Sequence, residues 1–246
     1  MIILVLSTPR SGSHYYTECI AENYPDCVVL HELLSRANKQ VYLKQAGDIE
    51  YSIQYHEGCY YHDVEDGTLV RKEEKRPEVE VFFESLIDKM KSSTKTYILH
   101  EHVSLLPDHW IDRLIDCADS VTYLKRDRRE QIASRVIAGY TSVYIVRPNY
   151  MLCHGNQKNK HLHNCEKFTE SIIDERTLQT IIEVYEDADL RMQSVHTVTY
   201  ESLPKRESAH KKLFVSSYNR LCSEDKLKID SLLSGKHETT SAVSVV

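Results

Sequence analysis

Apolar and polar residues recur along the chain in two periods, which predict strands that alternate with helices. The short apolar run 2–6 is typical of a buried strand, whereas the apolar residues between 79 and 90 recur at helical spacing. Strands are predicted over 2–7, 27–31, 96–100, 121–125 and 195–200, and helices over about 12–23, 79–90, 108–115, 128–140 and 176–192, with two more between 203 and 233. This order favours an α/β sandwich of three layers, in which helices flank a central parallel sheet.

Residues 35–78 interrupt this order. They are mixed and polar, carry Tyr and His side chains over 51–62, and end in the charged run 71–77, which is typical of a solvated linker. The length of 246 residues suits one α/β domain. We interpret 1–246 as a single domain with an insertion or lid at about 35–78. Aromatic faces suit sugars and phenols, so 51–62 is a candidate lining for an acceptor cleft.

The turn that follows the first predicted strand has the composition of an anion-binding loop. Residues 7–13 read Ser-Thr-Pro-Arg-Ser-Gly-Ser, and a helix is predicted to follow. The start of a helix directs backbone N–H groups and a positive dipole end at a bound anion. Arg10 adds a planar, bidentate positive charge, and Gly12 permits close approach of the backbone. A phosphate or sulfate group is the expected ligand, although the Gly-Lys-Ser/Thr of a Walker A loop is absent.

A second anion-binding segment is predicted where the strand 121–125 ends. Arg126 follows that strand, and Ser134 lies eight positions later, about two turns into the next predicted helix. Both loops join the carboxyl end of a strand to a helix, and ligands of open α/β sheets bind along that edge. We therefore expect the two segments to contact opposite ends of one ligand.

Together these motifs resemble those of sulfotransferases, which use 3′-phosphoadenosine 5′-phosphosulfate. Pro-Arg-Ser-Gly-Ser at 9–13 resembles the 5′-phosphosulfate loop of that family, and Arg126 with Ser134 resembles its 3′-phosphate site. Residues 200–203 (Tyr-Glu-Ser-Leu) and 96–107 resemble two further family segments. Arg128 stands where the family has Pro, and His100 stands where it has Lys. The resemblance implies a P-loop-like fold and sulfuryl transfer to a hydroxyl acceptor, first of all a carbohydrate or glycolipid.

The resemblance also implies roles for individual residues. Arg10 would stabilise the phosphosulfate as a catalytic residue, and either Glu32 or His102 would take the acceptor proton, with Glu32 slightly favoured. The donor-binding set would comprise Arg10, Ser11, Gly12, Ser13, His14, Tyr15 (against the adenine), Arg126 and Ser134. No metal is expected to take part.

Composition limits the partners and the compartment. Lys and Arg number 31 and Asp and Glu number 37, so the net charge of −6 argues against general nucleic-acid binding. Neither a basic leader nor a run long and apolar enough to cross a bilayer is seen, and seven scattered Cys indicate reduced thiols. A cytoplasmic protein with a small-molecule or glycan acceptor is expected. The sequence indicates no oligomeric state.

Three alternatives stay open. Cys153, His154, His161, His163 and Cys165 include good zinc ligands, although their spacing matches no common zinc motif. A P-loop kinase-like transferase with a degenerate loop is the second alternative. The third is a non-catalytic relative that binds a nucleotide or glycan without transferring anything.

Overall fold

The computed structural model describes residues 1–32, 41–46, 49–54, 60–65, 68–73, 77–147, 150–153, 157–204 and 216–235. Their contacts divide the chain into two compact units, the first comprising 1–125 and 185–203 and the second 126–184 and 204–246. No helix in these described ranges is long and apolar enough to span a bilayer.

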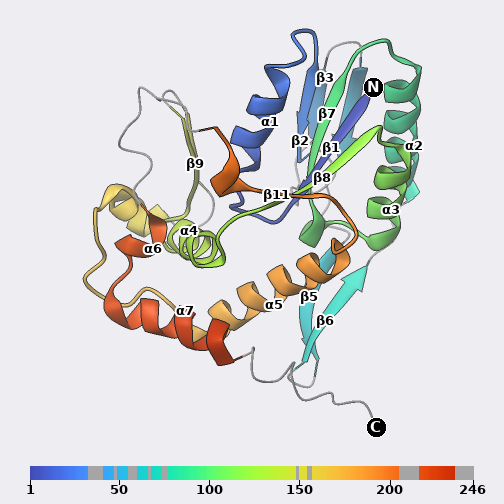
Figure 1. The fold of residues 1–246 in the computed structure, drawn as a ribbon. Coiled ribbons are helices and arrows are strands. Elements are labelled where there is room, and N and C mark those ends of the chain that lie inside the picture. The colour runs from blue at the N-terminus through green and yellow to red at the C-terminus, as the bar shows by residue number, and fades with distance from the viewer. Residues whose placement is uncertain are drawn as a thin grey trace. The chain divides into compact units, whose positions relative to one another are not determined.

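A five-stranded, all-parallel sheet forms the centre of the first unit (Figure 1). Its strands lie in the order β11-β8-β1-β7-β2. Their bounds are Ile2–Ser7 for β1, Val28–His31 for β2, Tyr97–His102 for β7, Ser120–Lys125 for β8 and Thr197–Thr199 for β11. Numbered along the chain within this sheet, the order is 2-3-1-4-5. The predicted α/β sandwich of P-loop-like type is confirmed.

Helices cover both faces of this sheet (Figure 1). α1 (Ser13–Ala21) lies on one face, where its Tyr16 and Ile20 pack against Ile3, Val5 and Ile98. The other face carries the larger core, formed with α2 (Pro77–Ser92), α3 (Asp108–Cys117) and the end of α5 (Glu175–Arg191). Because successive strand residues point to opposite faces, β1 and β7 supply both layers from alternate positions.

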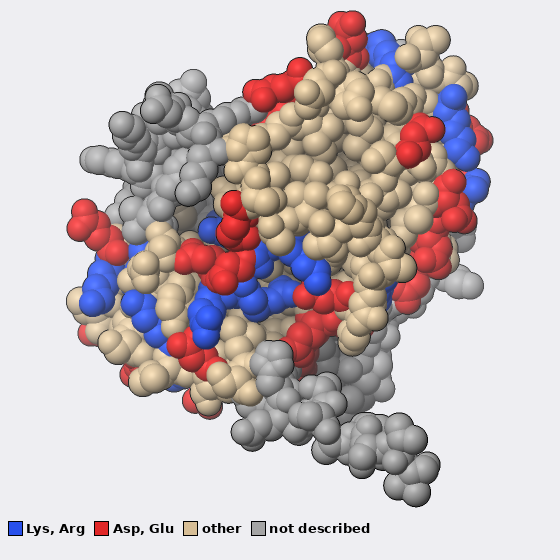
Figure 2. Space-filling model, in the orientation of Figure 1, with Lys and Arg blue, Asp and Glu red and all other residues tan. Residues whose placement is uncertain are grey.

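The buried side chains explain why α2 and α3 lie where they do. Phe83 of α2 and Trp110 of α3 stack with their ring centroids 5.2 Å apart, and both rings are almost completely buried. The outer surfaces of these helices mix both signs of charge at the right-hand edge of Figure 2. Arg113 of α3 bonds to Glu84 of α2 at 2.9 Å. This arrangement is the usual apolar stripe of a helix against a sheet, with charged residues turned outward.

Residues 41–73 contain four strands that the sequence analysis missed. β3 (Val41–Ala46) pairs with β4 (Ile49–Gln54), and β5 (Tyr60–Glu65) pairs with β6 (Thr68–Glu73), each pair antiparallel and separate from the central sheet. The predicted insertion at 35–78 thus contains two hairpins and the start of α2. The side chains proposed to line an acceptor cleft at 51–62 lie outside the described ones.

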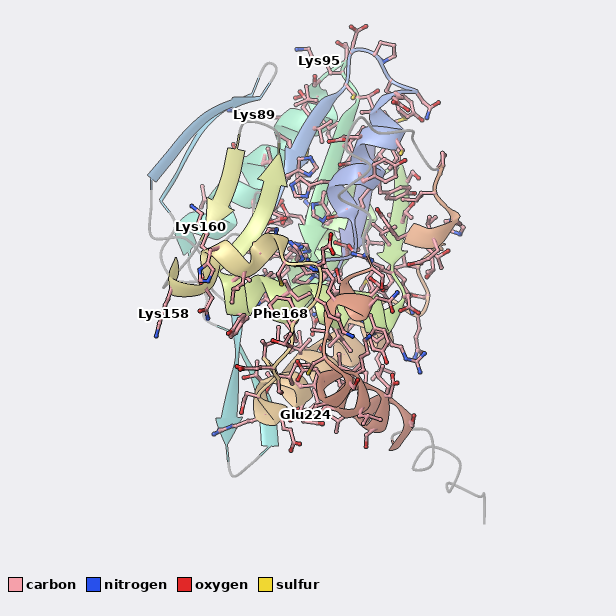
Figure 3. All side chains as sticks on the ribbon, turned by 90° about the vertical axis from the view of Figure 1, so that its left-hand side faces the viewer. Lys89, Lys95, Lys158, Lys160, Phe168 and Glu224 are labelled. Atoms are coloured by element: carbon pink, nitrogen blue, oxygen red, sulfur yellow. The ribbon has the colours of Figure 1, made fainter. Side chains whose placement is uncertain are left out.

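The second unit contains Arg126 and Ser134. Its elements are α4 (Arg128–Thr141), β9 (Val143–Arg147), β10 (Tyr150–Cys153), η2 (Gln157–Asn164), the first part of α5, α6 (Ser217–Arg220) and α7 (Ser223–Gly235). Lys158 and Lys160 project outward from η2, whereas Phe168 is buried (Figure 3). The segment with the Cys and His residues at 153–165 therefore contains the end of β10 and the 3-10 helix η2. The predicted strand 195–200 is shorter than expected, because Tyr200–Ser202 forms the short helix η3.

Candidate active site

Four histidines and a glutamate gather at the carboxyl ends of β1, β2 and β7. Strand pairing places His31 of β2 beside His100 of β7, and Ser7 of β1 beside His102. Side chains at the same register of parallel strands share one face, so Ser7, His31, His100 and His102 all lie on the face that α1 covers. Lys95, just ahead of β7, marks the opposite edge of the sheet (Figure 3).

The two candidate proton acceptors form one pair. Nε2 of His102 lies 3.2 Å from Oε1 of Glu32, and the backbone N–H of Glu32 donates to the carbonyl of His100 at 2.7 Å. The side chain of His102 is 9% exposed and that of Glu32 is 24% exposed. Glu32 and His102 are alternative proton acceptors on the sequence alone, whereas the structure brings both into one site. Their pairing leaves Glu32 as the member more accessible from outside.

The charge state of Glu32 follows from its surroundings. Burial by itself would raise the pKa of this carboxyl, but the charge of His102 and its hydrogen bond oppose that effect. Together with the charges of His100 and His14, they hold the pKa of Glu32 well below its ordinary 4.5. Glu32 is therefore a carboxylate at neutral pH and can only accept hydrogen bonds.

His100, unlike Glu32, is held in its uncharged form. It is fully buried, and burial lowers the pKa of its imidazole well below the ordinary 6.5, an effect that the charge of His102 strengthens. His100 is therefore neutral at neutral pH. In the sequence, His100 stands out only as a departure from the sulfotransferase pattern, and no role is predicted for His31.

His14, at the start of α1, extends the cluster. Its ring stacks on that of His31 with centroids 4.2 Å apart and planes 13° from parallel. Both rings lie edge-on to His100, at centroid distances of 6.0 Å for His14 and 5.6 Å for His31. His14 was predicted as part of the anion-binding loop, so the structure brings that loop and the Glu32–His102 pair to the same end of the sheet.

The loop from Thr8 to Ser13 starts α1 with an unusual backbone. Arg10 and Glu32 both have φ in the left-handed region, at +70° and +49°. Ser142 is the one other non-glycine residue in the described ranges with positive φ, and it ends α4 in the usual left-handed cap. Left-handed conformations of non-glycine residues are concentrated at functional sites, where the surrounding structure holds them in place. Two of the three candidate catalytic residues have this feature.

Ser11 is the loop residue that most clearly indicates a ligand. It is fully buried, and its Oγ makes no hydrogen bond within the described part of the chain. Gly12 is the N-cap of α1, so the helix has no side-chain cap. A buried hydroxyl next to the uncapped start of a helix is a suitable place for an oxyanion, which can accept hydrogen bonds from both.

The structure explains why residue 12 is a glycine. A Cβ built there would lie 2.3 Å from Cδ2 of Tyr200, and the φ of Gly12 is +89°. The sequence predicts that Gly12 lets the backbone approach a ligand. In the structure, the group that lies close to Gly12 is the ring of Tyr200. The ring of Tyr15 lies edge-on to Tyr200 at 6.1 Å, and the hydroxyl of Tyr185 donates to the carbonyl of Pro9 at 2.9 Å. Tyr185 and Tyr200 therefore hold this loop in place.

Arg126 and Ser134 lie in the second unit, at the start of α4. Asp127 caps this helix by accepting a hydrogen bond from the N–H of Glu130 at 3.0 Å. One guanidinium nitrogen of Arg126 lies 3.6 Å from Glu130, whose carboxylate also bonds to Ser216 and Ser217. Ser134 is buried two turns into α4. The segment thus has the strand-end arginine and helical serine that the sequence analysis predicted.

No model of a known protein family matches the chain, and no curated protein matches it. The function is therefore argued from these residues and from the fold.

The Cys and His residues at 153–165 form no metal centre in the described ranges. No group of three or more His, Cys, Asp or Glu side chains there is arranged to hold an ion. His154 lies outside the described residues, and so does the side chain of Cys153. Arg220 donates to the carbonyl of Cys165 at 3.0 Å and to that of His163, so backbone contacts hold this segment.

Proposed function

We propose that the protein transfers a sulfuryl group from 3′-phosphoadenosine 5′-phosphosulfate to a hydroxyl acceptor. The observation that carries the proposal is the 3.2 Å pair of Glu32 and His102 at the sheet edge where the loop of Arg10 starts α1. A proton acceptor beside an anion-binding loop is what group transfer to a hydroxyl requires.

The loop would hold the phosphosulfate end of the donor. Arg10 would provide the bidentate positive charge, and the backbone of Gly12, Ser13 and His14 would provide N–H donors. The buried Oγ of Ser11 supports this assignment, because an oxygen-rich group would satisfy a hydroxyl that bonds to no described residue. Tyr15 would lie against the adenine.

Arg126 and Ser134 would hold the 3′-phosphate. This assignment is supported by the position of Arg126 along the chain. Arg126 directly follows β8, and Leu124 of β8 pairs with Ser7, the last residue of β1. Both segments therefore leave the sheet from neighbouring strand ends. A phosphate would compete with the carboxylate of Glu130 for the guanidinium of Arg126.

The proposed reaction is an in-line displacement at sulfur. The acceptor oxygen forms a bond to sulfur, while the bond between sulfur and the bridging oxygen breaks and its electron pair passes to the 5′-phosphate. The acceptor proton passes to the carboxylate of Glu32, and the leaving group is 3′-phosphoadenosine 5′-phosphate. Arg10 would stabilise the negative charge that develops on the bridging oxygen.

A kinase-like phosphoryl transferase is the second candidate, because the strand order 2-3-1-4-5 suits both classes. It lacks support from the loop, which has neither the lysine nor the second glycine of a Walker A motif. The acceptor class, a carbohydrate or glycolipid, depends on the resemblance to sulfotransferases.

Calorimetric titration with 3′-phosphoadenosine 5′-phosphate tests donor binding. Arg10→Ala should weaken binding about 10- to 100-fold, since a hydrogen bond to a charged group contributes about 1.5–3 kcal/mol. Arg113→Ala is the matched control, because Arg113 lies on the exposed surface of α3. Arg126→Ala should also weaken binding, with exposed Arg176 of α5 as its control. Unchanged affinity in both Arg10→Ala and Arg126→Ala would refute the proposed donor site.

Transfer of labelled sulfuryl to a panel of hydroxyl acceptors tests the chemistry. Glu32→Gln should leave the affinity for 3′-phosphoadenosine 5′-phosphate within about twofold and reduce transfer by about 100-fold or more, the range of general base catalysis. Transfer of phosphate from ATP in the absence of the sulfuryl donor would favour the kinase-like candidate.

A further inference from the structure

A row of side chains continues inward from Glu32 beneath α1. Oγ of Ser7 lies 3.2 Å from Nδ1 of His102 and 2.9 Å from Nε2 of His100. The order is therefore Glu32, His102, Ser7, His100, with each member within hydrogen-bond distance of the next. Ser7 and His100 are fully buried, and His102 is buried as well. Hydrogen bonds between buried groups are electrostatically stronger than the same bonds in water.

Counting hydrogens fixes the direction of this row for the neutral form of His102. Ionised Glu32 only accepts, so Nε2 of His102 carries a hydrogen and donates to it. Ser7 has one hydroxyl hydrogen but faces two ring nitrogens. When His102 is neutral, its Nδ1 accepts that hydrogen, and Nε2 of neutral His100 donates to Oγ in turn. Each contact then has one donor and one acceptor.

We propose that Ser7 and His100 are positioning residues, which hold His102 with its Nε2 hydrogen directed at Glu32. The role that this gives Glu32 rests on the proposed function, in which the carboxylate takes the acceptor proton. Without Ser7, Nδ1 of His102 loses its hydrogen-bond donor, and the tautomer protonated at Nδ1 becomes accessible. That tautomer presents a lone pair to the carboxylate, so the pair would repel and separate.

The row matters for proton transfer because it uses only one oxygen of Glu32. The hydrogen bond from His102 engages Oε1, and in the proposed reaction the other carboxylate oxygen takes the acceptor proton. When the proton moves from the acceptor to Glu32, no hydrogen in the row has to change place. A preorganised carboxylate of this kind requires no reorientation in the transition state.

Ser7→Ala is the direct test, and nitrogen NMR of the histidine rings is the direct readout. Wild-type protein should show His102 protonated at Nε2, whereas Ser7→Ala should show a mixture that includes the Nδ1 tautomer. Ser7→Thr retains the hydroxyl and should restore the wild-type signals. Ser104→Ala is the matched control, since Ser104 is buried and its hydroxyl bonds to nothing described.

Kinetics provide the second readout. Ser7→Ala should lower kcat about 10- to 100-fold, within the contribution of general acid–base catalysis, and leave the donor KM unchanged. His100→Gln retains an N–H donor toward Ser7 and should keep most activity, whereas His100→Leu should not. This pair of variants also tests the row if Ser7→Ala fails to fold.

Identical His102 ring signals in wild type and Ser7→Ala would overturn the positioning role. So would equal activity of His100→Gln and His100→Leu. A wild-type protein that transfers no sulfuryl group would refute the proposed function alone, because the ring signals are measured without substrate.

Discussion

Replacing Gly12 by alanine would force a methyl group into the ring of Tyr200. The added Cβ would lie 2.3 Å and 2.4 Å from two ring carbons, and the backbone would stay at φ +89°. A left-handed backbone costs an L-residue about 1–2 kcal/mol, and overpacking costs about 1–3 kcal/mol. We therefore expect Gly12→Ala to lower the free energy of unfolding by about 2–5 kcal/mol.

Urea denaturation measures this loss, and Gly139 provides the control. An added Cβ at Gly139 meets nothing within 4 Å inside α4, so Gly139→Ala should stabilise the protein by about 0.5–1 kcal/mol. In a Tyr200→Ala background, Gly12→Ala should lose the overpacking part and keep only the backbone part. If Gly12→Ala is as stable as wild type, or if Tyr200→Ala leaves its full cost in place, the close contact at Gly12 is not what the structure describes.

Urea denaturation also tests two pH dependences of stability and one contact of the loop. Because the folded pKa of Glu32 lies below 4.5, its carboxylate stabilises the fold above that pH and loses this effect as the pH falls toward the folded pKa. The stability difference between wild type and Glu32→Gln should therefore shrink below about pH 4.5; a constant difference would argue against the pair with His102. His100 has a lowered pKa, so the unfolded chain takes up its proton first, and stability should fall below pH 6.5 in wild type but less in His100→Gln. Tyr185→Phe removes the bond to Pro9 and should cost about 1 kcal/mol in urea denaturation while weakening the binding of 3′-phosphoadenosine 5′-phosphate. Tyr97→Phe removes a comparable bond at the far edge of the sheet and should leave that binding unchanged.

Buried strands and amphipathic helices account for the part of the fold that the sequence predicts. β1, β7 and β8 are short apolar runs, and the periodicity of α3 and α4 is clear. The strands β3, β5 and β6 escape this reasoning because polar and apolar residues do not alternate cleanly in them, whereas β4 does alternate and was open to prediction. The pairs Gly47-Asp48 and Asp66-Gly67 stand between these strands in the sequence, and such pairs are typical of two-residue hairpin turns. These two residue pairs are the sequence signal from which the hairpin strands could have been predicted.

The site shows the same division between local and long-range information. The anion-binding loop identified Arg10, and the resemblance to sulfotransferases implied Glu32 and His102 as alternative proton acceptors. The contact of Glu32 with His102 depends on β2 lying next to β7, and no local pattern specifies that neighbour. The roles of Ser7 and His100 depend on register for the same reason. The spacing of His100 and His102, two residues apart in one strand, was the available signal that both side chains share a face.

The alternation of β7 has a consequence for how this protein can vary. Tyr97 and Leu99 face the apolar core, while His100 and His102 face the site under α1, so a single strand encodes both by odd and even position. Deleting or inserting one residue within β7 would exchange the two sets, placing imidazoles among hydrocarbons and a leucine beside Glu32. A substitution in β7 changes one side chain of the core or of the site, whereas a change in the length of β7 alters both at once.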